Sequence, residues 1–160
     1  MIDKFDLSQA SERELLSECL TQMFVLREAS IKDTGFHHAA VRQVLSYVRH
    51  TGRFADCKKK LAAGKRAPEI VVTRAIVGDD AFYLVEDGNH RTEAARQLGK
   101  KTILACVTCT YTIQLMKFAL WKDCLWHYNG HGEWEQQSSG KLPVKTIEGL
   151  KRLGIRQRIA

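Results

Sequence analysis

One short stretch of the sequence combines residue types that can bind a phosphate group. Residues 86–92 read Glu-Asp-Gly-Asn-His-Arg-Thr and lie between a β-rich run and a run of good helix formers. A helix N-terminus offers unpaired backbone N–H groups and the positive end of the helix dipole. Gly88 allows close backbone approach to a ligand, and Arg91 can place its planar fork on phosphate oxygens. We therefore expect an anion-binding turn here.

Acidic residues precede this turn and suggest a metal ion. Glu86 and Asp87 would repel a bare phosphate, so we interpret them as ligands of a divalent cation, Mg²⁺ or similar, that bridges carboxylate and phosphate. His90 can donate or transfer a proton near neutral pH. Asp87, His90 and Arg91 are the candidate catalytic residues. The alternative is that Asp87 and Asn89 only cap the helix while His90 and Arg91 are solvated.

The elements around the turn are predicted from periodicity. The runs 69–73 and 81–85 are β-rich and flank Gly78-Asp79-Asp80, which predicts a hairpin. A helix closed by Gly99 and a strand over 102–108 follow the turn, which completes a β-turn-α-β unit.

The flanks are predicted to be helical. Apolar residues at helical spacing predict one helix from Ser8 or Ser11 to Glu28, a second over 40–48 and a third from Phe54 to Ala63. Further helices are predicted over 112–128 and after Pro143. We therefore expect an α+β fold in which N- and C-terminal helices surround a small mixed sheet.

The central third of the chain resembles the ParB/sulfiredoxin superfamily. The residues that carry the resemblance are Asp87-Gly88-Asn89-His90-Arg91, then Ala94-Ala95 and Leu98-Gly99. Members of that superfamily keep a Gly-x-x-Arg turn between a strand and a helix and bind nucleotide there. The resemblance implies a sheet of that type over residues 65–110, with 1–64 and 111–160 as helical flanks of one domain, 1–160. It also implies a nucleotide-binding set made of Gly88, Asn89, His90, Arg91 and Thr92.

Departures from the relatives narrow the implied function. Sulfiredoxins carry a reactive cysteine where this chain has Asn89, so we do not expect cysteine-sulfinic acid reduction. Partition-type ParB proteins have Glu and Arg in place of Asn89 and His90, and a second Arg in place of Glu93, so we do not expect their CTP switch. The remaining branch holds small plasmid- or phage-borne nucleotide hydrolases and nucleases. The resemblance thus implies metal-dependent cleavage of ATP or another nucleoside triphosphate, DNase activity or both, and a role in inhibiting DNA transfer.

Composition and charge set the remaining limits. The chain has 160 residues, 44% of them apolar, and a net charge of +7, which fits one globular domain. Its longest apolar stretches are about half the ~20 residues of a membrane span, and its first residues do not form a signal peptide. We expect a cytoplasmic bacterial protein whose five cysteines are reduced.

The positive charge is concentrated in two blocks. The first is the candidate DNA-binding surface, made of Lys58, Lys59, Lys60, Lys65 and Arg66. The second lies within 141–160 and includes Arg152, Arg156 and Arg158. Such blocks are either solvated faces or surfaces for a polyanion, here DNA bound without sequence preference.

Two further patterns are weighed against simpler interpretations. Cys106, Cys109, His127 and His131 approach a zinc-finger spacing, but the two cysteines of a strand at this spacing point to opposite faces, so we do not expect zinc. Trp121, Trp126 and Trp134 can stack on bases, although aromatic residues at helical spacing are more often core.

Two classes of function stay open. One is an enzyme that hydrolyses a nucleotide, cuts DNA or does both. The other is a non-catalytic nucleotide- or DNA-binding module that inhibits a protein partner, such as part of a DNA-transfer machine, by contact.

Overall fold

Strands rich in β-branched residues form the centre of the molecule. In the computed structural model, β3 (Ile70–Val77) and β4 (Asp80–Asp87) make an antiparallel hairpin whose turn begins at Gly78, with φ of 61°. The helix α3 (Asn89–Gln97) follows, and β5 (Thr102–Ile113) returns parallel to β3. The hairpin and the β-turn-α-β unit predicted from the sequence are confirmed.

Two short strands complete this sheet at its edges. β1 (Gly35–Ala40) pairs antiparallel with β5, and β2 (Val44–Leu45) pairs parallel with β4, which gives the order β1-β5-β3-β4-β2. The predicted helix over 40–48 is therefore wrong. A 3-10 turn at Val41–Gln43 joins the two strands and buries Val41, and β2 buries Val44 and Leu45, a spacing that an α-helix would also satisfy.

The described residues are 4–31, 34–48, 51–65 and 68–158, and within them the fold is α+β with four α-helices and two mixed sheets. The first helix, α1 (Ala10–Gln22), ends earlier than predicted, and a separate 3-10 turn covers Leu26–Glu28. The helices α2 (Thr51–Ala62) and α4 (Val144–Arg152) lie where the sequence predicts them.

The second sheet replaces the helix predicted over 112–128. β6 (Phe118–Trp121) and β7 (Cys124–Tyr128) form a hairpin, flanked by β8 (Trp134–Gln136) and β9 (Arg156–Gln157) in the order β8-β7-β6-β9. Its turn residues Lys122 and Asp123 have φ of 50° and 63°, which a two-residue hairpin turn requires. Neither is glycine or asparagine, so the usual sequence signal for the turn is missing. The flanks that were expected to be helical therefore contain strands as well as helices.

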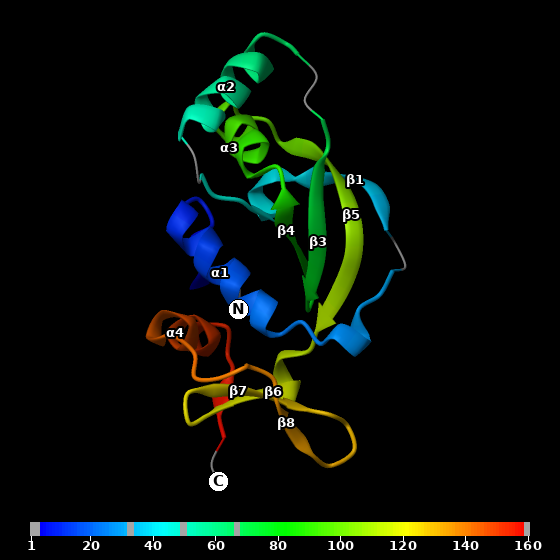
Figure 1. Cartoon of the computed structure of the whole chain (residues 1–160), viewed down its shortest axis with the longest axis vertical. Coiled ribbons are helices and arrows are strands. Elements are labelled where there is room, and N and C mark those ends of the chain that lie inside the picture. The colour runs from blue at the N-terminus through cyan, green and yellow to red at the C-terminus, as the bar shows by residue number, and fades with distance from the viewer. Residues whose placement is uncertain (1–3, 32–33, 49–50, 66–67, 159–160) are drawn as a thin grey trace.

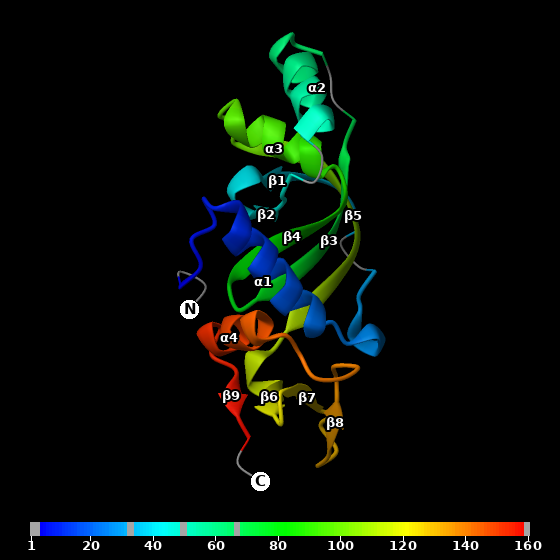
Figure 2. The same cartoon turned by 60° about the vertical axis from the view of Figure 1, so that its left-hand side comes forward.

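A shared core joins the two sheets. α1 covers one face of the five-stranded sheet, and α4 packs on α1 and on the second sheet (Figures 1 and 2). The largest fully buried side chains of this cluster come from all these elements and include Leu16, Leu20, Leu120, Leu125 and Leu150. The turn after β4, with α2 and α3, lies at one end of the long axis, and the second sheet lies at the other (Figure 1). Among the described residues, no helix is both long and apolar enough to cross a membrane.

Candidate functional site

The predicted turn is shaped by Gly88. This residue is the N-cap of α3 with φ of 115°, a conformation that side chains rarely adopt. A Cβ atom there would lie 2.4 Å from Cγ2 of Ile70 in β3. Both the backbone and the close strand therefore require glycine. The helix begins at once after it, and within the described residues its N-cap makes no side-chain capping hydrogen bond.

Arg91 is fixed at the side of this turn. Its Nη1 donates to the carbonyl oxygens of Pro68 and Glu69, at 3.2 and 3.1 Å, and its Nη2 lies 3.2 Å from Oδ2 of Asp87. The Arg91 side chain is 17% exposed, whereas that of Asp87 is 76% exposed. The guanidinium is thus held by backbone on one side and by a solvent-exposed carboxylate on the other.

The neighbouring residues have different local roles. Asn89 accepts a hydrogen bond from the Tyr47 amide at 3.3 Å, which joins the turn to the segment after β2. Thr92 is fully buried, and its hydroxyl donates to the Gly88 carbonyl at 3.0 Å, so it stabilises the helix start and does not face a ligand. His90 is half-buried and lines the cavity beside Arg91.

The two proposed metal ligands do not converge. Glu86 is an extra residue in β4 at a bulge, because Val85 pairs with Val72 and Asp87 pairs with Val71. Its Oε1 accepts hydrogen bonds from the hydroxyls of Thr73 and Thr108, at 2.6 and 3.1 Å. Asp87 instead pairs with Arg91. Of these two residues, only Asp87 lies beside the predicted anion-binding turn.

Two adjoining cavities share Arg91. One, of about 190 Å³, is lined by residues of α2 and of the turn: Arg53, Asp56, Cys57, Asp87, Gly88, His90 and Arg91. The other, of about 270 Å³, lies between α2, α3 and the start of β5 and includes Lys65 and Lys100. Each is smaller than a usual pocket for a whole ligand, about 300–1,000 Å³. Each has room for a phosphate group. Arg53 and Lys100 are not among the predicted site residues, and Arg53 reaches the turn because α2 packs on α3.

A buried ionic network fixes α3 relative to the rest of the fold. Oε1 of Glu93 accepts hydrogen bonds from Arg13 of α1 and from the Ser46 hydroxyl, both at 2.7 Å. Arg96 lies 3.5 Å from the same carboxylate and donates to the Val44 carbonyl. Burial, followed by the charge of Arg13, lowers the pKa of the Arg96 guanidinium. Glu93, which stands where partition-type ParB proteins have a second Arg, therefore has a structural role.

The first basic block lies on α2, next to the cavities. Lys58 donates to Oε1 of Gln97 in α3, Lys60 pairs with Asp56, and Lys59 and Lys65 are exposed. At least two of the three consecutive lysines thus face solvent, as predicted. Arg66 lies outside the described residues.

Neither Arg152 of the second basic block nor the cysteine and histidine residues with zinc-finger-like spacing form a binding site among the described residues. Arg152 makes a bidentate ion pair with Glu12 of α1, at 2.6 and 3.0 Å, so it is not free to bind a polyanion. Cys106 and Cys109 lie in β5, whereas His127 is buried in the second sheet with its ring 4.9 Å from that of Phe118. Within the described part of the chain, no three His, Cys, Asp or Glu side chains group around a common point. All five cysteines are free.

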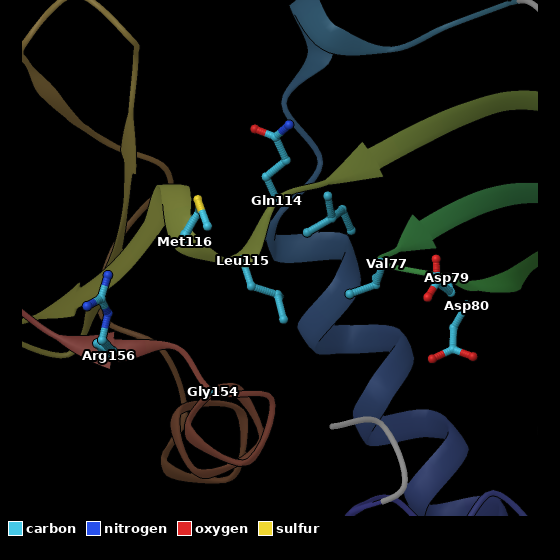
Figure 3. A pocket seen from close by; sticks show the side chains of 10 residues that line it. Val77, Asp79, Asp80, Gln114, Leu115, Met116, Gly154 and Arg156 are labelled. Atoms are coloured by element: carbon cyan, nitrogen blue, oxygen red, sulfur yellow. The ribbon is translucent and has the colours of Figure 1, made fainter.

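A cavity of about 770 Å³ lies between the β3–β4 hairpin and the second sheet, away from the turn that follows β4 (Figure 3). Val77 and Leu115 form apolar walls, while Asp79, Asp80 and Arg156 stand at its edges (Figure 3). None of residues 86–92 lines it.

Comparisons with known proteins add little to this geometry. No protein-family model matches the chain. A 58-residue segment, 36% of the chain, is 40% identical to part of the protein translocase subunit SecA of Synechococcus elongatus and of a second Synechococcus strain. The match spans only 6% of the length of these proteins.

Proposed function

We propose that the chain is a nucleotide-binding protein of the ParB/sulfiredoxin type. It holds ATP or another nucleoside triphosphate, with Mg²⁺ or a similar cation, at the turn after β4, and hydrolyses it, cleaves DNA or does both. The observation that carries the proposal is the position of Arg91. It stands beside the N-terminus of α3 and borders two cavities that also contain Arg53, Lys65 and Lys100.

The contacts of Arg91 suit an incoming phosphate. Its two backbone acceptors orient the guanidinium plane, and its third partner is the exposed carboxylate of Asp87. The Asp87 carboxylate is 76% exposed, so it can return to water when a phosphate replaces it at the guanidinium. The amides of the first helical turn then supply further donors to the same anion. The three other basic residues hold the rest of the phosphate chain.

The roles of Asp87 and His90 follow from this placement. Mg²⁺ is typically held by one or two carboxylates together with phosphates of the substrate, and when bound it stabilises charge on the reacting phosphate. Asp87, displaced from Arg91, is the predicted metal ligand that lines the cavity beside Arg91, whereas Asp56 of α2, which also lines it, pairs with Lys60. His90, in the same cavity, is the group that can transfer a proton to or from the reacting oxygen. Glu86, bonded to two threonine hydroxyls, supports the strand and takes no part.

One observation favours the alternative of a non-catalytic binding module. The paired carboxylates expected from the sequence, Glu86 and Asp87, have different partners, so of these two only Asp87 stands at the turn. A module that binds a nucleotide or DNA and inhibits a partner, as in a plasmid- or phage-encoded block on DNA transfer in the cytoplasm, needs no second carboxylate.

Turnover separates the two functions. Radiolabelled ATP and supercoiled plasmid are each incubated with the pure chain, with Mg²⁺ or with EDTA. We expect Mg²⁺-dependent hydrolysis that Asp87→Asn abolishes and that Glu86→Gln, the matched control, leaves nearly unchanged. Hydrolysis that persists in EDTA or in Asp87→Asn removes the metal from the mechanism. No hydrolysis by the unaltered chain, with nucleotide still bound, establishes the binding module.

DNA binding by α2 has its own test. Lys59 and Lys60 are exposed, and Lys65 continues the same basic surface toward Arg91. Replacing Lys58, Lys59 and Lys60 by Glu should weaken duplex DNA binding irrespective of sequence and reduce its salt dependence, because each phosphate contact contributes a slope of about −0.9. Binding of nucleotide at Arg91 should be unchanged. Equal DNA affinity of the triple variant and the parent at about 100 mM salt would show that the block is a solvated face.

A further inference from the structure

The second sheet has one buried and one partly open face. In β7, Leu125 and His127 are buried against the core, while Trp126 and Tyr128 alternate with them and stay half-buried. Trp134 of β8 pairs with Tyr128, and Ala119 of β6 pairs with Trp126. Directly paired residues lie on the same face of a sheet, so Trp126, Tyr128 and Trp134 share one face. Trp121 of β6 completes the set. We call these four residues, Trp121, Trp126, Tyr128 and Trp134, the aromatic face.

The rings of the aromatic face are in contact in pairs. The ring centroids of Trp121 and Trp126 are 5.6 Å apart with planes at 63°, and those of Tyr128 and Trp134 are 5.6 Å apart at 56°. The first pair meets edge to face and the second is tilted, so neither pair is stacked face to face, and each of the four residues keeps part of its surface accessible. The helical packing that would have made these tryptophans core residues is absent, because the segment is a sheet.

Positive side chains lie over the same rings. The ammonium of Lys122 is 4.6 Å from the Trp121 ring centroid, and the guanidinium of Arg158 is 6.0 Å from that of Trp121 and 5.4 Å from that of Trp134. Arg156 is exposed on the adjoining strand β9. Acidic residues also occur in these segments: Asp123 in the hairpin turn, Glu133 before β8 and Glu135 in β8, the last paired with Arg27. The charged groups that lie over the rings themselves are positive.

We propose that the aromatic face binds a single strand of nucleic acid. Unpaired bases stack on aromatic side chains without regard to sequence, and basic side chains beside them hold the phosphates. The bases of a duplex are already stacked on one another and cannot reach the rings. A proline-rich peptide also docks on aromatic side chains, but it offers no negative charge to the three cations. The site is independent of the proposed nucleotide-binding turn, which lies at the opposite end of the molecule (Figure 1).

Quenching of tryptophan fluorescence tests this inference. Oligothymidine and oligouridine of about 12 nucleotides are titrated into the whole chain at low salt, alongside a duplex of the same length and a proline-rich peptide. We expect both single strands to quench and bind, and the ratio of their affinities reports any preference for DNA or RNA. Affinity should fall with salt at a slope near −0.7 for each phosphate contact.

Substitutions locate the binding. Trp134→Ala should weaken the single strand about five- to hundredfold, Trp134→Phe should restore most of that loss, and Arg158→Gln should weaken binding and lower the salt slope by about 0.7. Phe36→Ala is the control, because Phe36 is an aromatic residue of the other sheet with 65% exposure. If Trp134→Ala melts at a lower temperature than the parent, the Trp134→Phe and Arg158→Gln variants decide whether the aromatic face binds the strand.

Three results would overturn the inference. These are an unaltered chain that binds no single strand, aromatic-face variants that bind as tightly as the parent, and a proline-rich peptide that binds more tightly than either strand. Arg91→Ala separates this inference from the proposed function. It should leave binding of the single strand intact, just as Trp134→Ala should leave binding of ATP intact.

Discussion

The carboxylate of Glu93 is shared by the buried Arg13, which hydrogen-bonds to it, and the half-buried Arg96, whose Nε lies 3.5 Å away without a hydrogen bond. Arg13 and Arg96 reach it from α1 and from the next turn of α3, and the Ser46 hydroxyl occupies the same oxygen. Removing one partner of a buried ion pair leaves an uncompensated charge in a low-dielectric site. The network therefore determines where α3 begins, and with it the position of Arg91.

Glu93→Ala should accordingly destabilise the protein strongly. We expect a loss of about 3–5 kcal/mol in the free energy of unfolding, measured by urea denaturation. Glu12→Ala, which breaks the partly exposed pair with Arg152, is the control and should cost less. Equal losses in the two variants would show that burial of the Glu93 network adds nothing.

His127 makes the stability depend on pH. Its Nε2 has no hydrogen-bond partner within the described residues and lies 3.9 Å from Oε1 of Glu28. Burial lowers the pKa of His127 below its usual 6.5, Glu28 opposes this, and Arg27 and Lys117 add to it. The unfolded chain therefore binds a proton that the folded chain excludes, so this stability is present above about pH 6.5 and is lost as the pH falls below it.

Urea denaturation between pH 7.5 and pH 5.5 tests this sign. The free energy of unfolding of the parent should fall over this interval by more than that of His127→Gln. An identical decline in both proteins would assign the pH dependence to other groups.

At the scale of elements, the contact of α1 with α4 depends on a missing side chain. An added Cβ at Gly149 would lie 2.6 Å from Sγ of Cys19 and 3.2 Å from Cδ1 of Leu15. The thiol is fully buried, and burial raises the pKa of Cys19 to about 12, so it is not ionised at neutral pH. Its function is packing.

Gly149→Ala therefore sets overpacking against helix propensity. Overpacking costs roughly 1–3 kcal/mol, and alanine gains about 1 kcal/mol over glycine in a helix, so we expect net destabilisation. In a Cys19→Ala background the new methyl group has room, and the same substitution should be neutral or stabilising. Thermal or urea unfolding of the four proteins of this cycle measures the coupling. Additive effects would contradict the proposed contact.

Elements with a complete local signal were predicted correctly, and those without one were not. The β3–β4 hairpin carries Gly78 at its turn, and α2 ends before Gly64, with φ of 79°. The β6–β7 hairpin instead turns through Lys122 and Asp123, so its aromatic residues were assigned to a helix. The helix predicted over 40–48 was wrong for a related reason, because a 3-10 turn followed by a strand buries the same positions as a helix.

At the scale of the whole molecule, long-range packing determines which residues from distant parts of the sequence join each site. Residues 86–92 are contiguous, so their turn could be predicted from one segment. Arg53 and Lys65 join it because α2 packs on α3, and no local pattern indicates that packing. Likewise, Arg158 meets Trp121 and Trp134 only because the last strand pairs with β6. The two ends of the molecule therefore carry separate clusters of positive charge.

Calorimetric titration of ATP with Mg²⁺ tests the central claim, that Arg91 anchors a nucleotide at the N-terminus of α3. We predict binding by the unaltered chain that Arg91→Ala weakens about ten- to hundredfold, because a charge-assisted bond to phosphate contributes roughly 1.5–3 kcal/mol. Arg91→Lys should fall between the two, and Lys145→Ala, which removes one exposed charge from α4, should bind like the parent. Equal affinity of the parent and a folded Arg91→Ala variant would contradict the account.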